Sequence, residues 1–272
     1  MPELPEVETT CRGLAPCLTG HRLVAMTVRD HRLRWPIDAA LPAHLRETTL
    51  KAIGRRGKYL LFDFGCGTML VHLGMSGSLR LVDTPEPASR HDHVDWVFSP
   101  GRLLLRLRDP RRFGAVLWHT EAIEEHPLLR HLGPEPLEPG FDGRYLFRAT
   151  RGAKASIKSV LMDSRKLVGV GNIYASEALF GAGIRPRMAA GRLTRDACDR
   201  LAAAVKHTLA AAIKAGGSSL RDYRGASGEL GHFQIEAKVY GRGGAPCRVC
   251  HTPIRRIVQS QRASYYCPHC QT

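Results

Sequence analysis

The sequence contains no long apolar run, no apolar leader and no internal repeat. Its uninterrupted apolar stretches stay well short of the roughly 18 residues that a membrane-spanning helix needs. The first residues carry several glutamates and do not form a secretory signal peptide. These absences exclude a membrane or secreted protein and predict a cytoplasmic one, whose 272 residues suffice for roughly two domains.

Acidic residues are scarce relative to basic ones. The chain has 25 Asp and Glu against 40 Lys and Arg, a formal net charge of +15. Such a surplus favours a polyanionic partner, most often nucleic acid. The arginines are spread along the chain, which indicates a basic face and not a basic tail. Charge alone fits a ribosomal or a merely adhesive protein almost as well.

Eight cysteines in a cytoplasmic chain favour a metal site over disulfides. Four of them have no ligand-like spacing and are expected to be small buried hydrophobes: Cys11, Cys17, Cys66 and Cys198. The other four follow the pattern Cys-x2-Cys-x16-Cys-x2-Cys: Cys247, Cys250, Cys267 and Cys270. Two thiolate pairs separated by the length of a hairpin close a tetrahedral site, so we expect one structural zinc ion with four protein ligands.

Residues 21–119 have the pattern of β-strands. Apolar residues alternate over short stretches without intervening helices, in Val24–Val28, Leu60–Phe64, Leu70–His72, Val94–Phe98 and Leu103–Leu107, with Ser99-Pro100-Gly101 as a hairpin connection. This alternation predicts antiparallel sheets with one buried face, in a sandwich or a barrel.

The second half of the chain has a helical pattern. A proline-rich stretch at 133–140 indicates a linker, and helices are expected over 156–162, 176–180 and 194–215. The glycine-bearing stretch 168–174 lies between the first two helices and lacks the spacing of a dinucleotide site. It favours a relative of the helix–turn–helix, which presents backbone N–H groups to phosphate.

The first residues, Met-Pro-Glu-Leu-Pro-Glu-Val-Glu, combine a helix start with reactive groups. Removal of Met1 would leave Pro2 with a free secondary amine, a candidate covalent nucleophile, and Glu3 beside it offers a carboxylate for proton transfer. Val7, Leu14 and their neighbours form an apolar helical stripe that ends before Gly20. The alternative interpretation is an ordinary capped helix with a solvated acidic turn.

Three further stretches are candidates for contact with phosphate or bases. His91 and His93 would share a strand face, as a metal pair or, in better agreement with the charge, as a phosphate contact. Lys58 enters a strand and could meet a phosphate or be merely solvated. The turn at 109–114 exposes an aromatic beside arginines, a combination that can read or wedge between bases, or be a solvated loop.

Taken together, these stretches resemble the formamidopyrimidine-DNA glycosylase family, the bacterial enzymes that remove 8-oxoguanine and ring-opened purines from DNA. The resemblance runs through five motifs in order: Pro-Glu-Leu-Pro-Glu-Val-Glu-Thr at the start, His-Leu-Gly-Met-Ser-Gly at 72–77, Asp-Pro-Arg-Arg-Phe-Gly at 109–114, Gly-Asn-Ile-Tyr-Ala-Ser-Glu at 171–177 and the four-cysteine tail. Leu4 favours this branch over endonuclease VIII, which usually has glycine there.

The resemblance implies a role for each matching residue. The catalytic set would be Pro2 as nucleophile at C1′, Glu3 for proton transfer, Lys58 and Arg262. Phosphates around the lesion would be gripped by Lys58, His91, Asn172, Tyr240 and Arg262. Met75, Arg111 and Phe113 would fill the gap left by a flipped base, with Arg111 facing the orphaned cytosine. Glu6 and the loop 218–233 would border the lesion pocket.

The resemblance also implies the architecture, an α+β multidomain fold. We expect an N-terminal helix and antiparallel β-sandwich over 1–132, a linker over 133–152, a helix–two-turns–helix domain with the lesion-pocket loop over 153–237, and a zinc β-hairpin over 238–272. The expected protein is a monomeric glycosylase and abasic-site lyase that acts on double-stranded DNA with oxidised bases or abasic sites. The alternatives are an endonuclease VIII-like enzyme for oxidised pyrimidines and a non-catalytic zinc-dependent DNA-binding protein.

Overall fold

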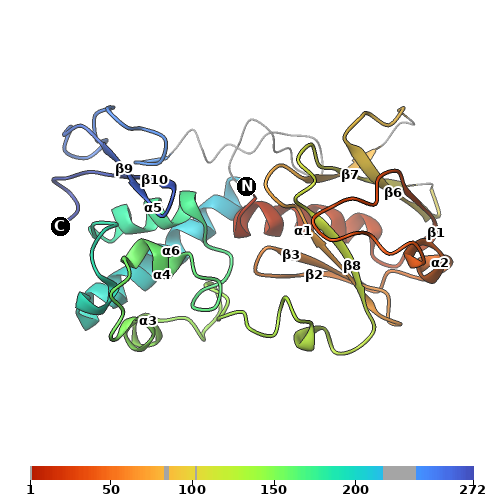
Figure 1. The fold of residues 1–272 in the computed structure, drawn as a ribbon, viewed down its shortest axis with the longest axis horizontal. Helices are drawn as coiled ribbons and strands as arrows, with labels where there is room; N and C mark the ends of the chain where they lie inside the picture. Colours follow the sequence, from red (N-terminus) through yellow and green to blue (C-terminus); the bar gives the residue numbers. More distant parts are fainter. Residues whose placement is uncertain (1, 83–85, 102, 217–236) are drawn as a thin grey trace. The chain divides into compact units, whose positions relative to one another are not determined.

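The computed structural model describes residues 2–82, 86–101, 103–216 and 237–272, whose helices and strands are traced in Figure 1. Within these ranges the chain divides into two compact units. The first comprises residues 2–130 together with 215–216, and the second comprises residues 131–214 together with 237–272. No helix in the described ranges is long and apolar enough to cross a membrane.

Helix α1 (Leu4–Leu18) opens the first unit and confirms the apolar stripe predicted there. Val7 is 1% exposed, and Leu14 and Leu18 are fully buried. Proline in the first turn has no N–H to leave unpaired, which suits the start of a helix. Gly20 follows with φ +85°, a conformation that a residue without a Cβ adopts at little cost and that leads the chain into the first strand.

Two four-stranded antiparallel sheets make up most of the first unit. One has the order β1 (Arg22–Val28), β6 (Asp92–Ser99), β7 (Leu103–Arg108), β5 (Ser78–Val82). The other has the order β2 (Ala52–Arg56), β3 (Tyr59–Asp63), β4 (Thr68–His72), β8 (Ala115–His119). The short helix α2 (Leu41–Leu45) and the 3-10 turn η1 (Ile123–Glu125) complete the unit.

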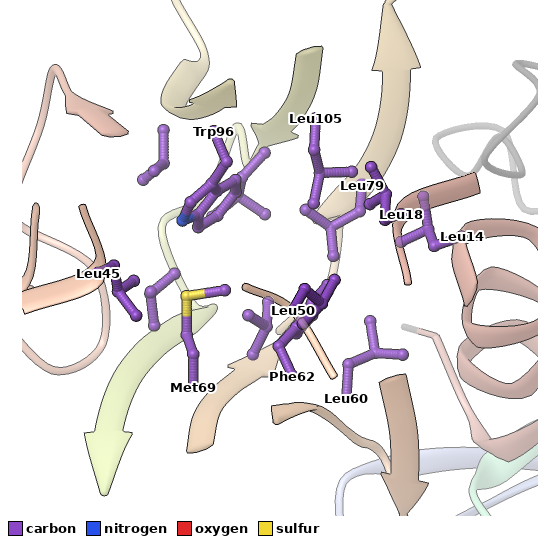
Figure 2. Close-up of a cluster of buried hydrophobic side chains, with 14 of the residues drawn as sticks. Leu14, Leu18, Leu45, Leu50, Leu60, Phe62, Met69, Leu79, Trp96 and Leu105 are labelled. Carbon is purple, nitrogen blue, oxygen red and sulfur yellow. The ribbon is translucent and has the colours of Figure 1, made fainter. Parts of the chain in front are cut away.

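The two sheets and α1 share one apolar core. Trp96 and Leu105 come from the first sheet and Phe62 and Met69 from the second, and all four are fully buried. Figure 2 shows these side chains meeting between the strands, with Leu14 and Leu18 of α1 beside them. The predicted N-terminal helix and antiparallel β-sandwich are therefore confirmed.

Strands β1 and β4 depart from the predicted alternation to different extents. In β1 the predicted residues Met26 and Val28 pack against the core, but the pairing with β6 shifts register between Leu23 and Ala25, which puts Val24 in a bulge and buries Leu23 fully. In β4 it is Met69 and Val71 that join the core, although the predicted face held Leu70 and His72. A bulge or a strand buried on both faces is invisible to a period-two pattern.

The second unit combines helices with a two-stranded hairpin. Its helices are α3 (Gly143–Thr150), α4 (Ile157–Leu161), α5 (Asn172–Gly181) and α6 (Arg195–Lys214), with the 3-10 turn η2 (Ala190–Arg192) before α6. Helix α6 packs against both α3 and α5. Strands β9 (Arg255–Gln259) and β10 (Arg262–Tyr266) form the hairpin and pair antiparallel. This arrangement confirms the helical part and the C-terminal hairpin of the expected fold.

Two helix boundaries differ from the expectation. Helix α5 begins at Asn172, within the stretch expected as a turn, because Gly171 ends the extended backbone and serves as its N-cap. Residues 143–150, part of the segment expected as a linker, form helix α3. Its N-cap Asp142 accepts a 2.6 Å hydrogen bond from the Tyr145 N–H, and Leu146 is buried. The proline-rich residues that precede this helix led to the prediction of a linker there.

Candidate active site and nucleic-acid interface

The start of α1 holds Pro2 and Glu3 in a buried position. Glu3 is 2% exposed, and Glu6, one turn later, is fully buried. A Glu6 carboxylate oxygen accepts a 2.7 Å hydrogen bond from the Glu3 N–H, which satisfies one of the free donors at the helix start. The predicted nucleophile and proton-transfer residue thus stand together at the positive end of a helix that caps itself.

Lys58 lies in the turn between β2 and β3, and several contacts hold this turn against α1. The Arg55 guanidinium donates from Nε to Glu8 at 2.7 Å and from Nη1 to the Gly57 carbonyl at 3.0 Å. Burial alone would raise the pKa of Glu8, but its hydrogen bonds to Arg55 and Arg12 outweigh burial and lower that pKa. Glu8 therefore stays ionised and keeps the Lys58 turn against the helix that begins with Glu3.

Two turns of the first unit each expose an apolar side chain, and one of these side chains lies beside an arginine. Met75, between β4 and β5, is 41% exposed, and Phe113, between β7 and β8, is 43% exposed. The Arg111 guanidinium lies 4.8 Å from the centroid of the Phe113 ring. The prediction that residues 109–114 form a turn exposing an aromatic beside arginines is confirmed.

The same two turns pack backbone against backbone. A Cβ added to Gly74 would lie 2.5 Å from the Phe113 carbonyl carbon, and one added to Gly114 would lie 2.7 Å from the His72 carbonyl oxygen. Gly74 also has φ +62°. Both positions exclude a side chain, so the turns that carry Met75 and Phe113 are held at a fixed separation.

The two histidines expected to share a strand face have different surroundings. His93 is 5% exposed, and its Nε2 lies 2.8 Å from the Asp109 carbonyl oxygen. The register of β6 shifts between Asp92 and Val94, which breaks the period-two pattern there. His91 lies just before β6 and is only half-buried. His93 is therefore an internal histidine with its hydrogen bond satisfied, and for His91 a phosphate contact stays a prediction.

His72, the last residue of β4, is a half-buried histidine to which no role was assigned from the sequence. Burial, and then the positive charges of Lys58 and Arg34, lower the pKa of His72 to about 4. The neutral ring accepts the Gly74 N–H at Nδ1 over 3.0 Å, and its centroid lies 4.9 Å from that of the Tyr59 ring, which is tilted against it by 46°. It thereby supports the turn that contains Met75.

In the second unit, Asn172 and Arg262 line one pocket of about 300 Å³ beside the β9–β10 hairpin. Asn172 is the first residue of α5, and its Nδ2 donates to the Ala263 carbonyl at 3.0 Å, while its buried Oδ1 has no hydrogen-bond partner among the residues that the structure describes. Arg262 is exposed and begins β10 directly after the two-residue turn Ser260–Gln261. The structure therefore brings together these two predicted phosphate contacts, which are distant in sequence.

Tyr240, the third predicted phosphate contact of this unit, is anchored by an acid that the patterns missed. Glu177 of α5 is 5% exposed. Its carboxylate accepts three backbone N–H groups, from Lys238 at 2.8 Å, Val239 at 3.0 Å and Tyr240 at 2.8 Å. An acidic residue within an otherwise apolar helix was the available signal, since such a group is buried only with several donors around it.

The four spaced cysteines converge as predicted. The sulfur atoms of Cys247, Cys250, Cys267 and Cys270 all lie within 4.8 Å of one another. Four thiolates at this separation fit a tetrahedral zinc ion and leave no ligand position for a substrate, so the ion would be structural. Backbone N–H groups of Val249 and Cys270 approach the sulfurs of Cys247 and Cys267 at 3.5 and 3.4 Å. Within the described ranges this is the only cluster of at least three metal-ligating groups.

Two further expectations concern the four isolated cysteines and the lesion-pocket loop. Cys11 and Cys198 are buried as expected, but Cys17 and Cys66 are exposed, and for these two the prediction was wrong. Cys17 lies in the last turn of α1 and Cys66 in the connection between β3 and β4, and neither belongs to the core cluster. The expected lesion-pocket loop, 218–233, lies outside the described residues.

Three family models match the chain in succession. The N-terminal domain of formamidopyrimidine-DNA glycosylase matches residues 1–116, the H2TH domain of the same enzyme matches residues 132–224, and a zinc finger found in FPG and IleRS matches residues 244–272. Curated relatives cover the full chain. Formamidopyrimidine-DNA glycosylase of Thiobacillus denitrificans is 64% identical over all of both chains, and that of Bordetella avium is 58% identical over 100% of this chain and 99% of its own.

Solved structures are similar along the whole chain as well. The MutM (FPG) protein of Thermus thermophilus is 40% identical, with a TM-score of 0.88 over 99% of this chain and 98% of its own. A Lactococcus lactis FPG mutant in complex with Fapy-dG-containing DNA is 32% identical, with a TM-score of 0.92 over all of both chains. MutM in complex with carbocyclic 8-oxo-G-containing DNA is 32% identical, with a TM-score of 0.91 over all of both chains.

Proposed function

The chain belongs to the formamidopyrimidine-DNA glycosylase family, and on that premise we propose that Pro2, freed by removal of Met1, is the nucleophile of its reaction. The protein is a base-excision repair enzyme, a DNA glycosylase and abasic-site lyase with one structural zinc ion. Its substrate is double-stranded DNA that contains oxidised purines or abasic sites. Because that substrate is the chromosome, we place the protein in the cytoplasm at the nucleoid.

The observation that carries the assignment is the pairing of Pro2 with Glu3 at the capped start of α1. The Pro2 nitrogen attacks C1′ of the damaged nucleotide, the bond from C1′ to the base breaks, and the proton that the attacking amine gives up is transferred to the departing base. Glu3 delivers the proton that O4′ needs as the sugar ring opens, leaving an iminium between Pro2 and C1′. The positive iminium acidifies the C2′ proton.

Loss of that proton expels the 3′ phosphate by β-elimination, and a second elimination expels the 5′ phosphate. Water then hydrolyses the iminium and restores the Pro2 amine. We assign Lys58 and Arg262 to the proton transfers and phosphate charge of these eliminations, because each is a cation on a turn or hairpin start. Neither elimination consumes a cofactor, which agrees with a zinc site closed by four cysteines.

C1′ is inaccessible inside a duplex, so the nucleotide must be flipped out of the stack. We propose that Met75, Arg111 and Phe113 fill the vacated space, since two of these side chains are exposed apolar groups and the third stacks on Phe113. Arg111 would donate to the orphaned cytosine. Phosphate contacts from His91, Asn172 and Tyr240 would offset the unstacking, which costs a few kcal/mol. We place Glu6 at the border of the lesion pocket, next to Glu3.

Borohydride trapping tests the nucleophile. Reduction of the iminium on an 8-oxoguanine duplex should join wild-type protein to DNA covalently, whereas Pro2→Gly should lose most of this adduct. The mass of the N-terminal peptide should show in parallel that Met1 is removed. Unchanged trapping by Pro2→Gly would move the nucleophile to a lysine such as Lys58 or Lys154.

Glu3→Gln tests proton transfer separately from binding. This variant keeps the size of the side chain and should bind lesion DNA with wild-type affinity while it excises 8-oxoguanine at least about 100-fold more slowly, the usual contribution of a general acid. Wild-type excision would contradict the role of Glu3.

Duplexes that carry an oxidised pyrimidine in place of 8-oxoguanine should be poor substrates, which separates this enzyme from the endonuclease VIII type.

A further inference from the structure

One buried carboxylate, that of Asp109, lies where the proposed DNA-contacting segments of the first unit meet. Asp109 is fully buried. Its Oδ1 accepts the Ser76 hydroxyl at 3.3 Å and the Arg111 N–H at 3.3 Å, and its Oδ2 accepts the Gly114 N–H at 2.7 Å. The carboxylate therefore joins the turn that carries Met75 to the turn that carries Arg111.

The backbone of Asp109 extends the junction to a third segment. Its N–H donates to the His91 carbonyl at 2.9 Å, and its carbonyl oxygen lies 2.8 Å from Nε2 of His93 and accepts the Arg112 N–H at 3.2 Å. Met75, His91, Arg111 and Phe113 are thus all within two residues of an atom that is bonded to Asp109. With Lys58, they are the residues of this unit outside α1 to which a gap-filling or phosphate role was assigned.

The charge of Asp109 is met by N–H and O–H dipoles. Within the described ranges no lysine or arginine forms an ion pair with it, although Arg111 and Arg112 are its near neighbours in sequence. Their guanidinium groups point elsewhere, Arg111 to the Phe113 ring and Arg112 to Asp30. A buried acid without a cation is tolerated only when several directed donors surround it, and these donors fix the geometry of the loops that supply them.

We propose that Asp109 is a positioning residue for lesion recognition, which holds Met75, Arg111 and Phe113 in the single arrangement that can enter a duplex and face the orphaned base. The inference rests on the proposed gap-filling role of these three side chains. Asparagine cannot substitute, because it offers one acceptor oxygen where Asp109 uses two, and its amide would point N–H groups at an N–H donor.

The test compares the activity of the Asp109→Asn variant on two substrates. A single-stranded oligonucleotide with a preformed abasic site needs the Pro2 chemistry but no gap filling, whereas a duplex with 8-oxoguanine opposite dC needs both. We expect cleavage of the single strand to stay within about twofold of wild type, and duplex excision to fall about 30-fold, with a smaller preference for dC over dA opposite the lesion. A purely structural role would lower both activities by the same factor, and an unchanged ratio overturns the inference.

Two further variants provide a control and a second, milder test. Asp95→Asn removes another buried acid of the same unit, one that is paired with Arg29 and Arg106 on the first sheet, and should leave the ratio of the two activities unchanged. Ser76→Ala removes a single donor to Asp109 and should shift the ratio in the same direction by about threefold, even if Asp109→Asn does not fold. Absence of any shift in Ser76→Ala would then overturn the inference.

A double variant, Met75→Ala with Phe113→Ala, separates this inference from the role on which it rests. If it lowers the duplex-to-single-strand ratio while Asp109→Asn does not, the gap-filling role stands and the positioning role of Asp109 fails. If the double variant leaves the ratio unchanged, the gap-filling role itself fails.

Discussion

Glu177→Gln is the substitution whose effect follows most directly from the geometry of the second unit. One carboxylate oxygen of Glu177 accepts the N–H groups of Val239 and Tyr240, and the other accepts that of Lys238. Glutamine can place its single oxygen to keep the first pair, but its NH2 group then faces the N–H of Lys238.

The magnitude is a sum over these three hydrogen bonds. A buried hydrogen bond to a charged group contributes roughly 1.5–3 kcal/mol, and a neutral one about 1 kcal/mol. Losing one charged bond and weakening two others should cost about 3 kcal/mol of the free energy of unfolding. Glu177→Ala loses all three and should cost about 5 kcal/mol, close to the whole stability of many domains.

Urea unfolding of the intact protein measures this loss, and Glu138→Gln is the matched control. Glu138 is an exposed acid of the same unit, so its substitution should change stability by no more than about 0.5 kcal/mol. Because Glu177 fixes the backbone of Tyr240, Glu177→Gln should also weaken binding of lesion DNA at concentrations where the protein is folded. A loss below about 1 kcal/mol would refute the reasoning, since the three N–H groups would then have found other acceptors.

Three further predictions concern the zinc site, a histidine and the free thiols. Cys267→Ser should release zinc and abolish DNA binding, as followed by metal analysis and gel shift, while Cys66→Ser should do neither; binding that survives zinc loss would make the hairpin dispensable. Because burial lowers the pKa of His72 from 6.5 to about 4, the unfolded chain is protonated first as pH falls, so the stability due to this group is intact above about pH 6.5 and is lost toward pH 4. The difference in unfolding free energy between wild type and His72→Gln should therefore shrink by about 2 kcal/mol from pH 7 to pH 5, and a constant difference would contradict the pKa assignment. Burial also raises the pKa of Cys11 to about 11, so iodoacetamide at pH 8 should modify Cys17 and Cys66 first, as peptide mass spectrometry can show.

Much of the fold follows from residue spacing. The stripe of α1 and the buried positions of β3 and β6 obey the ordinary helical and strand periods, and the four cysteines carry their own spacing rule. The bulge in β1 could not be predicted, because it depends on which residue of β6 pairs with Leu23 and not on either strand alone. Helix α3 was not predicted, because the prolines that precede it indicated a linker.

The residues of the candidate site could likewise be predicted only in part. Pro2, Lys58 and the turn at 109–114 were identified from residue types and motifs, and their individual roles rest on the family resemblance. The supporting residues, by contrast, emerged only in three dimensions. Glu177 and Asp109 are acids whose importance comes from the backbone N–H groups gathered around them, and the chain supplies those donors from segments up to 63 residues away. A sequence records the acid but not its donors.

The paired glycines at positions 74 and 114 restrict how this protein can change over time. Each lies against the backbone of the opposite turn, so a methyl group at one cannot be relieved by trimming a side chain at the other. No single nucleotide change at either codon, and no combination of the two, yields a larger residue that fits. In a complete mutational library selected for resistance to oxidative mutagenesis, almost no substitutions should consequently be recovered at either glycine. The neighbouring exposed residues Met75 and Phe113 should accept other bulky apolar residues.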